Sequence, residues 1–327
     1  MKMNKILLSV CIPTYNRADV LKKTLTKVIK FIDKSIYDLD IIINDNASQD
    51  DTENYIKGLN SKYIKYFKNS ETVSADENFY RVLKCADGEY SILLGDKHYI
   101  IEKNFNELLK ILNDFKYSAV VTRAKGRNIK IKNNVYKNPV LFMNDLGWHY
   151  TLLSSIVFSK RIIDNFDIAT YKWNNFIHHF ILTQYLFNNN SEIFWLNKEI
   201  LEAVPMVSSG WISSSVEIFG RNWSKYILSL PFDIPEDTRA KIIKDHSINT
   251  NLFTFEYYYM LSKKYGLTIK KIDECKEYVK YFSQIPYEKI CDIIDSKFSL
   301  TDKFRIFVYE IKFKIKEIIK SSLKFGR

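Results

Sequence analysis

The stretch LLSVCIPTYNRADVLKKTL, residues 7–25, contains the unit from which the first half of the chain is built. Residues 6–12 form an apolar, β-rich run that predicts a first buried strand. Pro13 and Asn16 are typical of a turn, and apolar residues then recur at the three- and four-residue spacing of a helix. A strand that passes through a short turn into a helix is the repeating unit of an α/β fold.

The same alternation continues to residue 122. Apolar runs predict further strands at 40–44, 63–67, 90–95 and 117–122, and helical spacing predicts helices at 18–32, 51–59, 76–86 and 103–114. The strands are almost continuous in Ile, Val and Leu, which is typical of strands that are covered on both faces. We therefore expect an α/β fold with a mostly parallel central sheet and helices on both of its faces.

The pattern changes after residue 122. A basic turn, RAKGRNIKIK (123–132), is followed by a strand-like run at 151–158 and a helix-like run at 174–187, and from residue 235 the spacing is helical to the end. These changes predict a first domain at 1–205, an aromatic-rich connecting or lid segment at 206–234, and a helical C-terminal region at 235–327. Within the lid segment, Trp211 either faces a ligand ring or fills a core.

Composition narrows the classes of protein. The 327 residues are 46% hydrophobic, and Lys plus Arg (49) exceed Asp plus Glu (38), a net charge of +11 that attracts nucleotide phosphates, nucleic acid or an anionic membrane. No RNP, OB or helix-turn-helix pattern supports a nucleic-acid partner. The four cysteines show no CxxC spacing, and no run of about 18 apolar residues occurs, so we expect a cytoplasmic protein without a membrane-spanning helix.

Polar clusters follow three of the predicted strands. They are PTYNR (13–17), NDNAS (44–48) and GDKH (95–98). Ligands of parallel sheets bind beyond the carboxyl ends of the strands, so the clusters should converge on one crevice. Tyr15 could stack on a base, Arg17 could pair with phosphate, and Asp45 beside an Asn suits a nucleobase edge. Ser48 and the acids after it equally suit an ordinary helix N-cap.

Three stretches together resemble the family 2 glycosyltransferases with a GT-A fold. LLSVCIPTYNRADVLKKTL resembles the family's first strand and turn, DIIINDNASQDDT its second strand and uridine-contacting acid, and ENFYRVLKCADGEYSILLGD the helix that leads to its metal-binding motif. The resemblance covers about residues 6–187. It implies a nucleotide-sugar site whose candidate residues are Pro13, Thr14, Tyr15, Arg17, Asp45, Asn46, Asn78 and Arg81.

The resemblance also implies a metal-binding motif, which this sequence alters. Relatives whose strand ends in Leu-Leu-Gly continue with three acids that bind a divalent cation, whereas this chain has Asp96, Lys97 and His98. Lys97 could replace the cation as a fixed charge on the donor diphosphate. Alternatively, Asp96 and His98 could ligate Mn²⁺ or Mg²⁺. A third reading is a surface pair of Asp96 and Lys97 in a protein that has lost activity.

The general base is a separate question. Where the family often has Glu-Asp at the start of a helix, this chain has His178 and His179, and histidine can act as a base near neutral pH. The alternative is that one histidine packs in the helix and the other is solvated. Asp164 and Asp167 are rival candidates.

These expectations combine into one function. We expect an inverting glycosyltransferase that moves a sugar from a nucleotide donor, UDP-linked, to a surface polysaccharide such as capsule or to a lipid-linked glycan precursor; the alternative is a catalytically silent nucleotide-sugar-binding or scaffold protein. The last segment, 303–325, spaces Phe304, Phe307, Ile311, Ile315, Ile318 and Ile319 along one helical face among lysines. Such a helix either packs on its own domain or lies peripherally on an anionic membrane, here the inner face of the plasma membrane.

Overall fold

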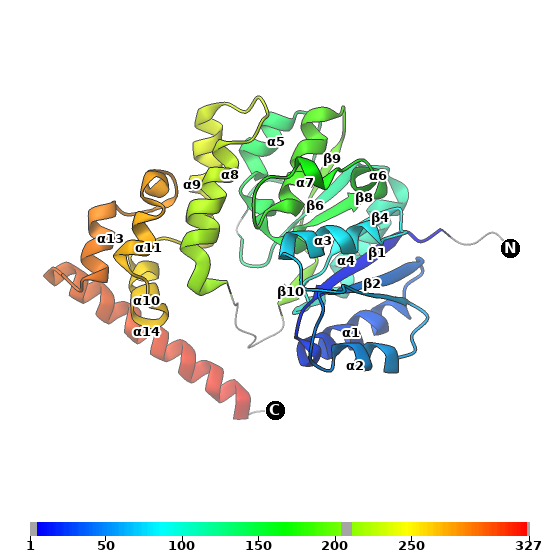
Figure 1. Cartoon of the computed structure of the whole chain (residues 1–327), viewed down its shortest axis with the longest axis horizontal. Helices are drawn as coiled ribbons and strands as arrows, with labels where there is room; N and C mark the ends of the chain where they lie inside the picture. Colours follow the sequence, from blue (N-terminus) through cyan, green and yellow to red (C-terminus); the bar gives the residue numbers. More distant parts are fainter. Residues whose placement is uncertain (1–4, 128, 204–210, 326–327) are drawn as a thin grey trace. The chain divides into compact units, whose positions relative to one another are not determined.

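The computed structural model describes residues 5–127, 129–203 and 211–325, with side chains as far as residue 315 apart from that of residue 203. The chain forms two compact units (Figure 1). Unit 1 comprises Met1–Ser208 with Pro231–Ile234, and unit 2 comprises Ser209–Leu230 with Pro235–Arg327. The expected connecting or lid segment at 206–234 is thus shared between the two units, and its residues 206–210 lie outside the described residues.

Unit 1 is built on an eight-stranded sheet with the order β3-β2-β1-β4-β8-β6-β9-β7. The strands are β1 (Leu8–Thr14), β2 (Leu39–Asp45), β3 (Ile64–Lys68), β4 (Tyr90–Leu93), β6 (Ala119–Arg123), β7 (Asn134–Tyr136), β8 (Ile156–Ser159) and β9 (Ile193–Glu199). Only β7 and β8 run against the others among the described strands. The mostly parallel sheet is confirmed, and β1, β2, β4 and β6 all end at the same edge.

Helices cover both faces of this sheet. On one face, α1 (Ala18–Ile32), α2 (Thr52–Gly58) and α4 (Glu102–Asp114) share a core cluster with the alternate strand residues Leu8, Val10 and Ile12. The other face is covered by α3 (Ala75–Lys84), with α6 (Lys160–Asp164) and α7 (Ile177–Asn188) beside it (Figure 1). Side chains alternate across a strand, so one apolar run can supply both cores.

The predicted strand at 151–158 is wrong over its first half. Two short 3₁₀ turns, His149–Thr151 and Leu153–Ser155, precede β8. The Ser155 hydroxyl donates to the Leu152 carbonyl at 2.7 Å, a local bond that competes with strand pairing. Also absent from the sequence prediction are helix α5 (Pro139–Leu146), strands β7 and β9, and a small antiparallel pair of β5 (His98–Ile100) with β10 (Leu201–Ala203).

Unit 2 is helical, as predicted for the C-terminal region. It begins with a 3₁₀ turn (Ile212–Ser214) and a π-helix (Val216–Asn222), which leads into α8 (Trp223–Leu228). It continues with α9 (Glu236–Thr250), α10 (Phe255–Tyr265), α11 (Ile269–Asp273), a 3₁₀ turn (Lys276–Tyr278), α12 (Val279–Phe282), α13 (Tyr287–Ile294) and α14 (Leu300–Phe325). None of the helices within the described ranges has the length and apolarity needed to cross a membrane.

Candidate functional site

A pocket of about 500 Å³ opens where β1, β2 and β4 end, and we call it the β1 pocket. Its lining includes Pro13, Thr14, Tyr15 and Arg17 from the first predicted cluster, Asn46 from the second, and Gly95 and Asp96 from the third; Asn78 of α3 also contributes. The three clusters therefore converge, as the rule for parallel sheets predicts.

An ion pair forms the charged side of the β1 pocket. Arg17 Nη1 lies 2.9 Å from Asp96 Oδ1, and only 7% of Asp96 is exposed. The Thr24 hydroxyl donates to the Asp96 carbonyl at 2.6 Å and fixes the turn that follows β4. Burial raises the pKa of Asp96, although the Arg17 guanidinium acts in the opposite direction. The ion pair thus places one cation and one acid directly against the pocket.

The next two residues of the turn lie differently. Lys97 is partly buried and does not line the β1 pocket; burial and the neighbouring Arg17 charge lower its pKa. His98 packs its ring on Gly95, where a Cβ atom would lie 2.7 Å from His98 Nδ1. A larger residue at 95 would therefore force the His98 ring to shift. The pKa of His98 is lowered, chiefly by burial.

These residues do not form a ready-made metal site. Asp96 is paired with Arg17, and His98 Nδ1 is buried against Gly95 without a hydrogen-bond partner in the described residues. Throughout the part of the chain that the structure describes, no three His, Cys, Asp or Glu groups lie together as a metal would require. The candidate ligands Asp96 and His98 thus do not fit a preformed Mn²⁺ or Mg²⁺ site.

A network of side-chain amides forms the other side of the β1 pocket. Asn44 Nδ2 donates to Asn78 Oδ1 at 2.6 Å, and Asn69 Nδ2 donates to Asn46 Oδ1 at 2.9 Å and to Asn78 Oδ1 at 3.1 Å. Arg81 donates to Asn69 Oδ1 at 3.0 Å and pairs with Glu77, so it supports the network without lining the pocket. Such linked bonds hold Asn46 and Asn78 in fixed orientations.

Asp45 lies behind this pocket rather than in its wall. The residue is fully buried, and its two carboxylate oxygens accept hydrogen bonds from the Ser48 N–H at 2.9 Å and from the Tyr66 hydroxyl at 2.7 Å. The Ser48 hydroxyl in turn accepts from the Asn16 N–H at 2.8 Å, which joins the first two clusters. In this geometry Asp45 positions the turn, and its contact with a nucleobase stays a prediction.

The structure places His178 and His179, the predicted general-base candidates, inside the core of unit 1. Both are buried in α7, and neither lines the β1 pocket. His178 Nε2 lies 3.0 Å from the Thr151 carbonyl and His179 Nε2 lies 2.9 Å from the Gly147 carbonyl, so each ring N–H donates a hydrogen bond to a backbone carbonyl. Burial lowers the pKa of His178 to about 4. The two rings anchor the segment 147–151, which speaks against either as the general base.

The rival carboxylates are also engaged elsewhere. Asp164 pairs with Lys160 at 3.0 Å, and Asp167 accepts the Ala169 N–H at 3.0 Å at the start of a 3₁₀ turn. Among the described residues, Asp96 is the one carboxylate that lines the β1 pocket. Neither Asp164 nor Asp167 lines the β1 pocket, so this geometry does not favour either of them as the base.

Several lining residues escaped the sequence analysis. Thr72 and Val73 follow the carboxyl end of β3, so the rule that found the other clusters could have found them. Leu153 also lines the pocket, but the misassigned strand at 151–158 concealed it. Trp211 belongs to unit 2, where it packs edge-on against Phe219 with ring centroids 5.3 Å apart. Residues 206–210 of the predicted lid segment lie outside the described residues.

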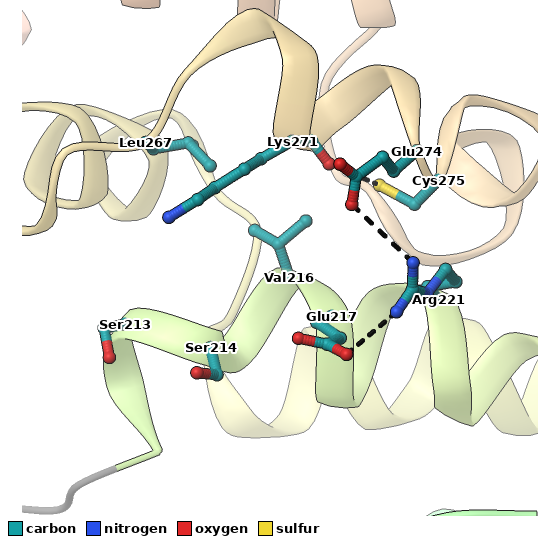
Figure 2. A pocket seen from close by; sticks show the side chains of 9 residues that line it. All are labelled: Ser213, Ser214, Val216, Glu217, Arg221, Leu267, Lys271, Glu274 and Cys275. Atoms are coloured by element: carbon teal, nitrogen blue, oxygen red, sulfur yellow. Dashed lines mark hydrogen bonds and ion pairs between the residues drawn. The ribbon is translucent and has the colours of Figure 1, made fainter.

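Unit 2 contains a smaller pocket of about 170 Å³, shown in Figure 2. Arg221 lines it but is neutralised by Glu217 at 2.8 Å and Glu274 at 3.7 Å. Figure 2 shows the Lys271 side chain extending across the opening. Pockets for nucleotide-sized ligands usually measure about 300–1,000 Å³, so this one is too small for such a ligand and the β1 pocket is the better candidate.

Two curated proteins illustrate what the sequence is similar to. The abequosyltransferase RfbV of Salmonella typhimurium is 28% identical over 202 residues, which cover 54% of this chain and 60% of the relative. The GalNAc(5)-diNAcBac-PP-undecaprenol beta-1,3-glucosyltransferase of Campylobacter jejuni is 30% identical over 172 residues, 48% of this chain and 53% of the relative. The chain thus spans little more than half the length of these relatives.

Solved structures share the fold at low sequence identity. S. aureus TarS 1-349, in complex with UDP-GlcNAc, superposes with a TM-score of 0.60 at 15% identity, covering 89% of this chain and 91% of that one. The mannosyltransferase PcManGT from Pyrobaculum calidifontis gives a TM-score of 0.52 at 12% identity, covering 97% and 88%. The model of the family "Glycosyl transferase family 2" matches residues 9–194, more than half of the chain and almost all of the sheet that builds the β1 pocket. The chain therefore belongs to glycosyl transferase family 2.

Proposed function

We propose that this protein is an inverting glycosyltransferase that moves a sugar from a UDP-linked donor to a surface polysaccharide or to a lipid-linked precursor. The observation that carries the proposal is the β1 pocket, where the three predicted clusters meet inside the region matched by the family. The names of two similar proteins support the UDP donor and the lipid-linked acceptor. One structural neighbour was solved with UDP-GlcNAc, and one relative is named for a PP-undecaprenol acceptor.

The two sides of the pocket suit the two ends of such a donor. Tyr15 is 45% exposed at the pocket and offers a ring face for a base, while Asn46 and Asn78 offer fixed amide groups. Arg17 lies at the charged side, where its planar guanidinium can pair with phosphate oxygens. The nucleoside would therefore contact the amide network and Tyr15, and the diphosphate would lie toward Arg17 and Lys97.

Transfer then requires an acceptor hydroxyl to attack the anomeric carbon as the bond to the diphosphate breaks. The hydroxyl proton passes to solvent water, the new glycosidic bond inverts the anomeric configuration, and the nucleoside diphosphate departs with the bonding electrons. Positive groups fixed near the leaving oxygen stabilise the developing negative charge. Arg17 and Lys97 supply that charge in this proposal, so the need for a divalent cation is reduced.

Donor binding and turnover test the proposal together. UDP and a panel of UDP-sugars should raise the melting temperature of the parent protein, because a ligand that binds only the folded state stabilises it. The matching sugar should be released or transferred in the presence of EDTA. Stabilisation by UDP without hydrolysis or transfer of any donor would favour the catalytically silent alternative. No stabilisation by any nucleotide would remove the β1 pocket as a donor site.

A further inference from the structure

A second pocket, of about 240 Å³, lies beside the β1 pocket, and we call it the β6 pocket. Two chain segments contribute to both pockets. Gly95, Asp96 and Leu153 line the β1 pocket, whereas His98, Leu152 and Ser154 line the β6 pocket. The Gly95 N–H donates to the Ser154 hydroxyl at 3.2 Å, so the two segments touch and form the wall between the pockets.

The β6 pocket is lined in part by the basic turn (123–132), none of whose described residues lines the β1 pocket. Arg123 is the last residue of β6 and Lys125 follows it, at the same edge of the sheet as the ends of β1 and β4, and both line the pocket. Arg127 is half-buried and donates to the Thr151 hydroxyl at 3.2 Å and to the His149 carbonyl. Arg127 therefore ties the basic turn to the segment 149–151.

The charges around this pocket are arranged for an anion. Glu199 lies 3.6 Å from Arg123, and Glu202 lies 3.2 Å from Lys125, but neither carboxylate lines the pocket. Arg123 Nε is buried and has no hydrogen-bond partner among the described residues. Two cations line the pocket, and Arg123 has a buried N–H donor whose hydrogen bond is not made by the described residues.

The size and surroundings of the pocket limit the ligand. A volume of about 240 Å³ is below the usual range for a whole nucleotide, but it accommodates a phosphate group or an acidic sugar residue. The hydroxyl of Ser154 adds a polar contact, and Leu152 and Leu201 add an apolar wall. This mixture suits one charged group attached to a larger, partly apolar molecule.

We propose that the β6 pocket holds an anionic group of the acceptor, a phosphate or a carboxylate, through Arg123 and Lys125. The inference rests on the proposed function, because it assigns the acceptor to the pocket beside the donor. An acceptor anchored there would reach a donor in the β1 pocket across the Gly95–Ser154 contact. Arginine suits this role because its fork can donate two parallel hydrogen bonds to a phosphate or carboxylate.

The test uses the parent protein saturated with UDP, so that the β1 pocket is filled. Isothermal titration calorimetry then measures binding of inorganic pyrophosphate and, separately, of glucuronate; the first probe represents a phosphate-bearing acceptor and the second an acidic sugar. Arg123→Gln and Lys125→Gln should each weaken the bound probe about tenfold or more, since hydrogen bonds to charged groups are the strong ones. Lys137→Gln, which breaks the comparable Lys137–Glu192 pair at 2.7 Å, is the matched control and should bind like the parent.

The outcomes separate this inference from the proposed function. Failure of both probes to bind, or equal binding by the parent and all variants, overturns the anion site. Circular dichroism checks the fold of each variant; if Arg123→Gln does not fold, Lys125→Gln, whose side chain is 60% exposed, carries the test. A parent that does not bind UDP but binds pyrophosphate through Arg123 would instead retain the anion site and remove the proposed donor.

Discussion

The two sides of the β1 pocket are built on different principles. On the amide side, Asn44, Asn46, Asn69 and Asn78 bond to one another and to the backbone, and no side chain among them carries a charge. On the charged side, one short turn brings Asp96 and Lys97 close to Arg17, and burial shifts the pKa of both turn residues toward their neutral forms.

This difference separates recognition from chemistry. The amide network is already satisfied before any ligand arrives, so it can hold its shape and present a few fixed polar groups. The charged side holds two cations and one acid close together, so a bound phosphate would be attracted to it. Substitutions on the amide side should therefore mainly lower the free energy of unfolding, whereas substitutions on the charged side should mainly lower kcat.

Replacing Lys97 with alanine should have the largest effect on turnover. We expect kcat to fall about 10²- to 10³-fold, because a group that stabilises the leaving diphosphate has been removed. Lys97→Arg should retain more activity, since it keeps the charge, and the exposed Lys103→Ala should match the parent. Transfer from a UDP-sugar, measured with and without EDTA, provides the readout. If EDTA abolishes transfer, Mn²⁺ restores it and His98→Ala removes that restoration, then Asp96 and His98 hold a metal and Lys97 is misassigned.

Replacing Asn78 with alanine tests the amide side. The change leaves the amide donors of Asn44 and Asn69 with fewer acceptors in a buried setting, so the free energy of unfolding should fall by about 2–3 kcal/mol. Urea denaturation measures it, and the exposed Asn54→Ala is the control. A loss below about 0.5 kcal/mol, together with a large fall in kcat, would reverse the division between the two sides.

Lowering the pH tests how much His178 stabilises the segment that includes the pocket-lining residue Leu153. His178 is buried, and its pKa is lowered to about 4, so the unfolded chain binds a proton near pH 6.5 that the folded chain does not. Stability is therefore complete above pH 6.5 and falls as the pH drops toward 4, by about 2 kcal/mol between pH 7 and pH 5 for this residue. His178→Gln should flatten that part of the stability–pH curve in urea titrations. An unchanged slope in the variant would show that the imidazole is not responsible.

Substitutions in α14 should have the smallest effect on UDP binding in the β1 pocket. Phe304, Phe307 and Ile315 are each at least half exposed there, and Lys303, Lys312 and Lys314 lie on the same helix. We expect Phe304→Ser with Phe307→Ser to reduce sedimentation with anionic vesicles while UDP affinity stays within about twofold. Vesicles of neutral lipid are the control. Sedimentation that is equal in the parent and the variant would remove the predicted membrane contact.

Much of unit 1 was readable from the sequence because burial on both faces leaves a strong signal. The runs ending at Thr14, Asp45 and Leu93 are apolar and β-branched, and the polar residues after them converge as parallel strands require. What could not be read depends on contacts between distant residues. Nothing in the local sequence shows that Arg17 pairs with Asp96, that Tyr66 occupies the Asp45 carboxylate, or that His178 donates to a backbone carbonyl 27 residues away.

The packing of His98 on Gly95 links the two positions in protein engineering. While the imidazole is in this position, a Cβ atom at residue 95 would overlap it, so a substitution of the glycine requires the His98 ring to shift or to be replaced. An Asp at residue 98 would both relieve that overlap and add a carboxylate two residues after Asp96. A single substitution, His98→Asp, would therefore give this turn an acidic spacing like the one that the family resemblance implies. This variant is the most direct way to ask whether the protein can be made metal-dependent.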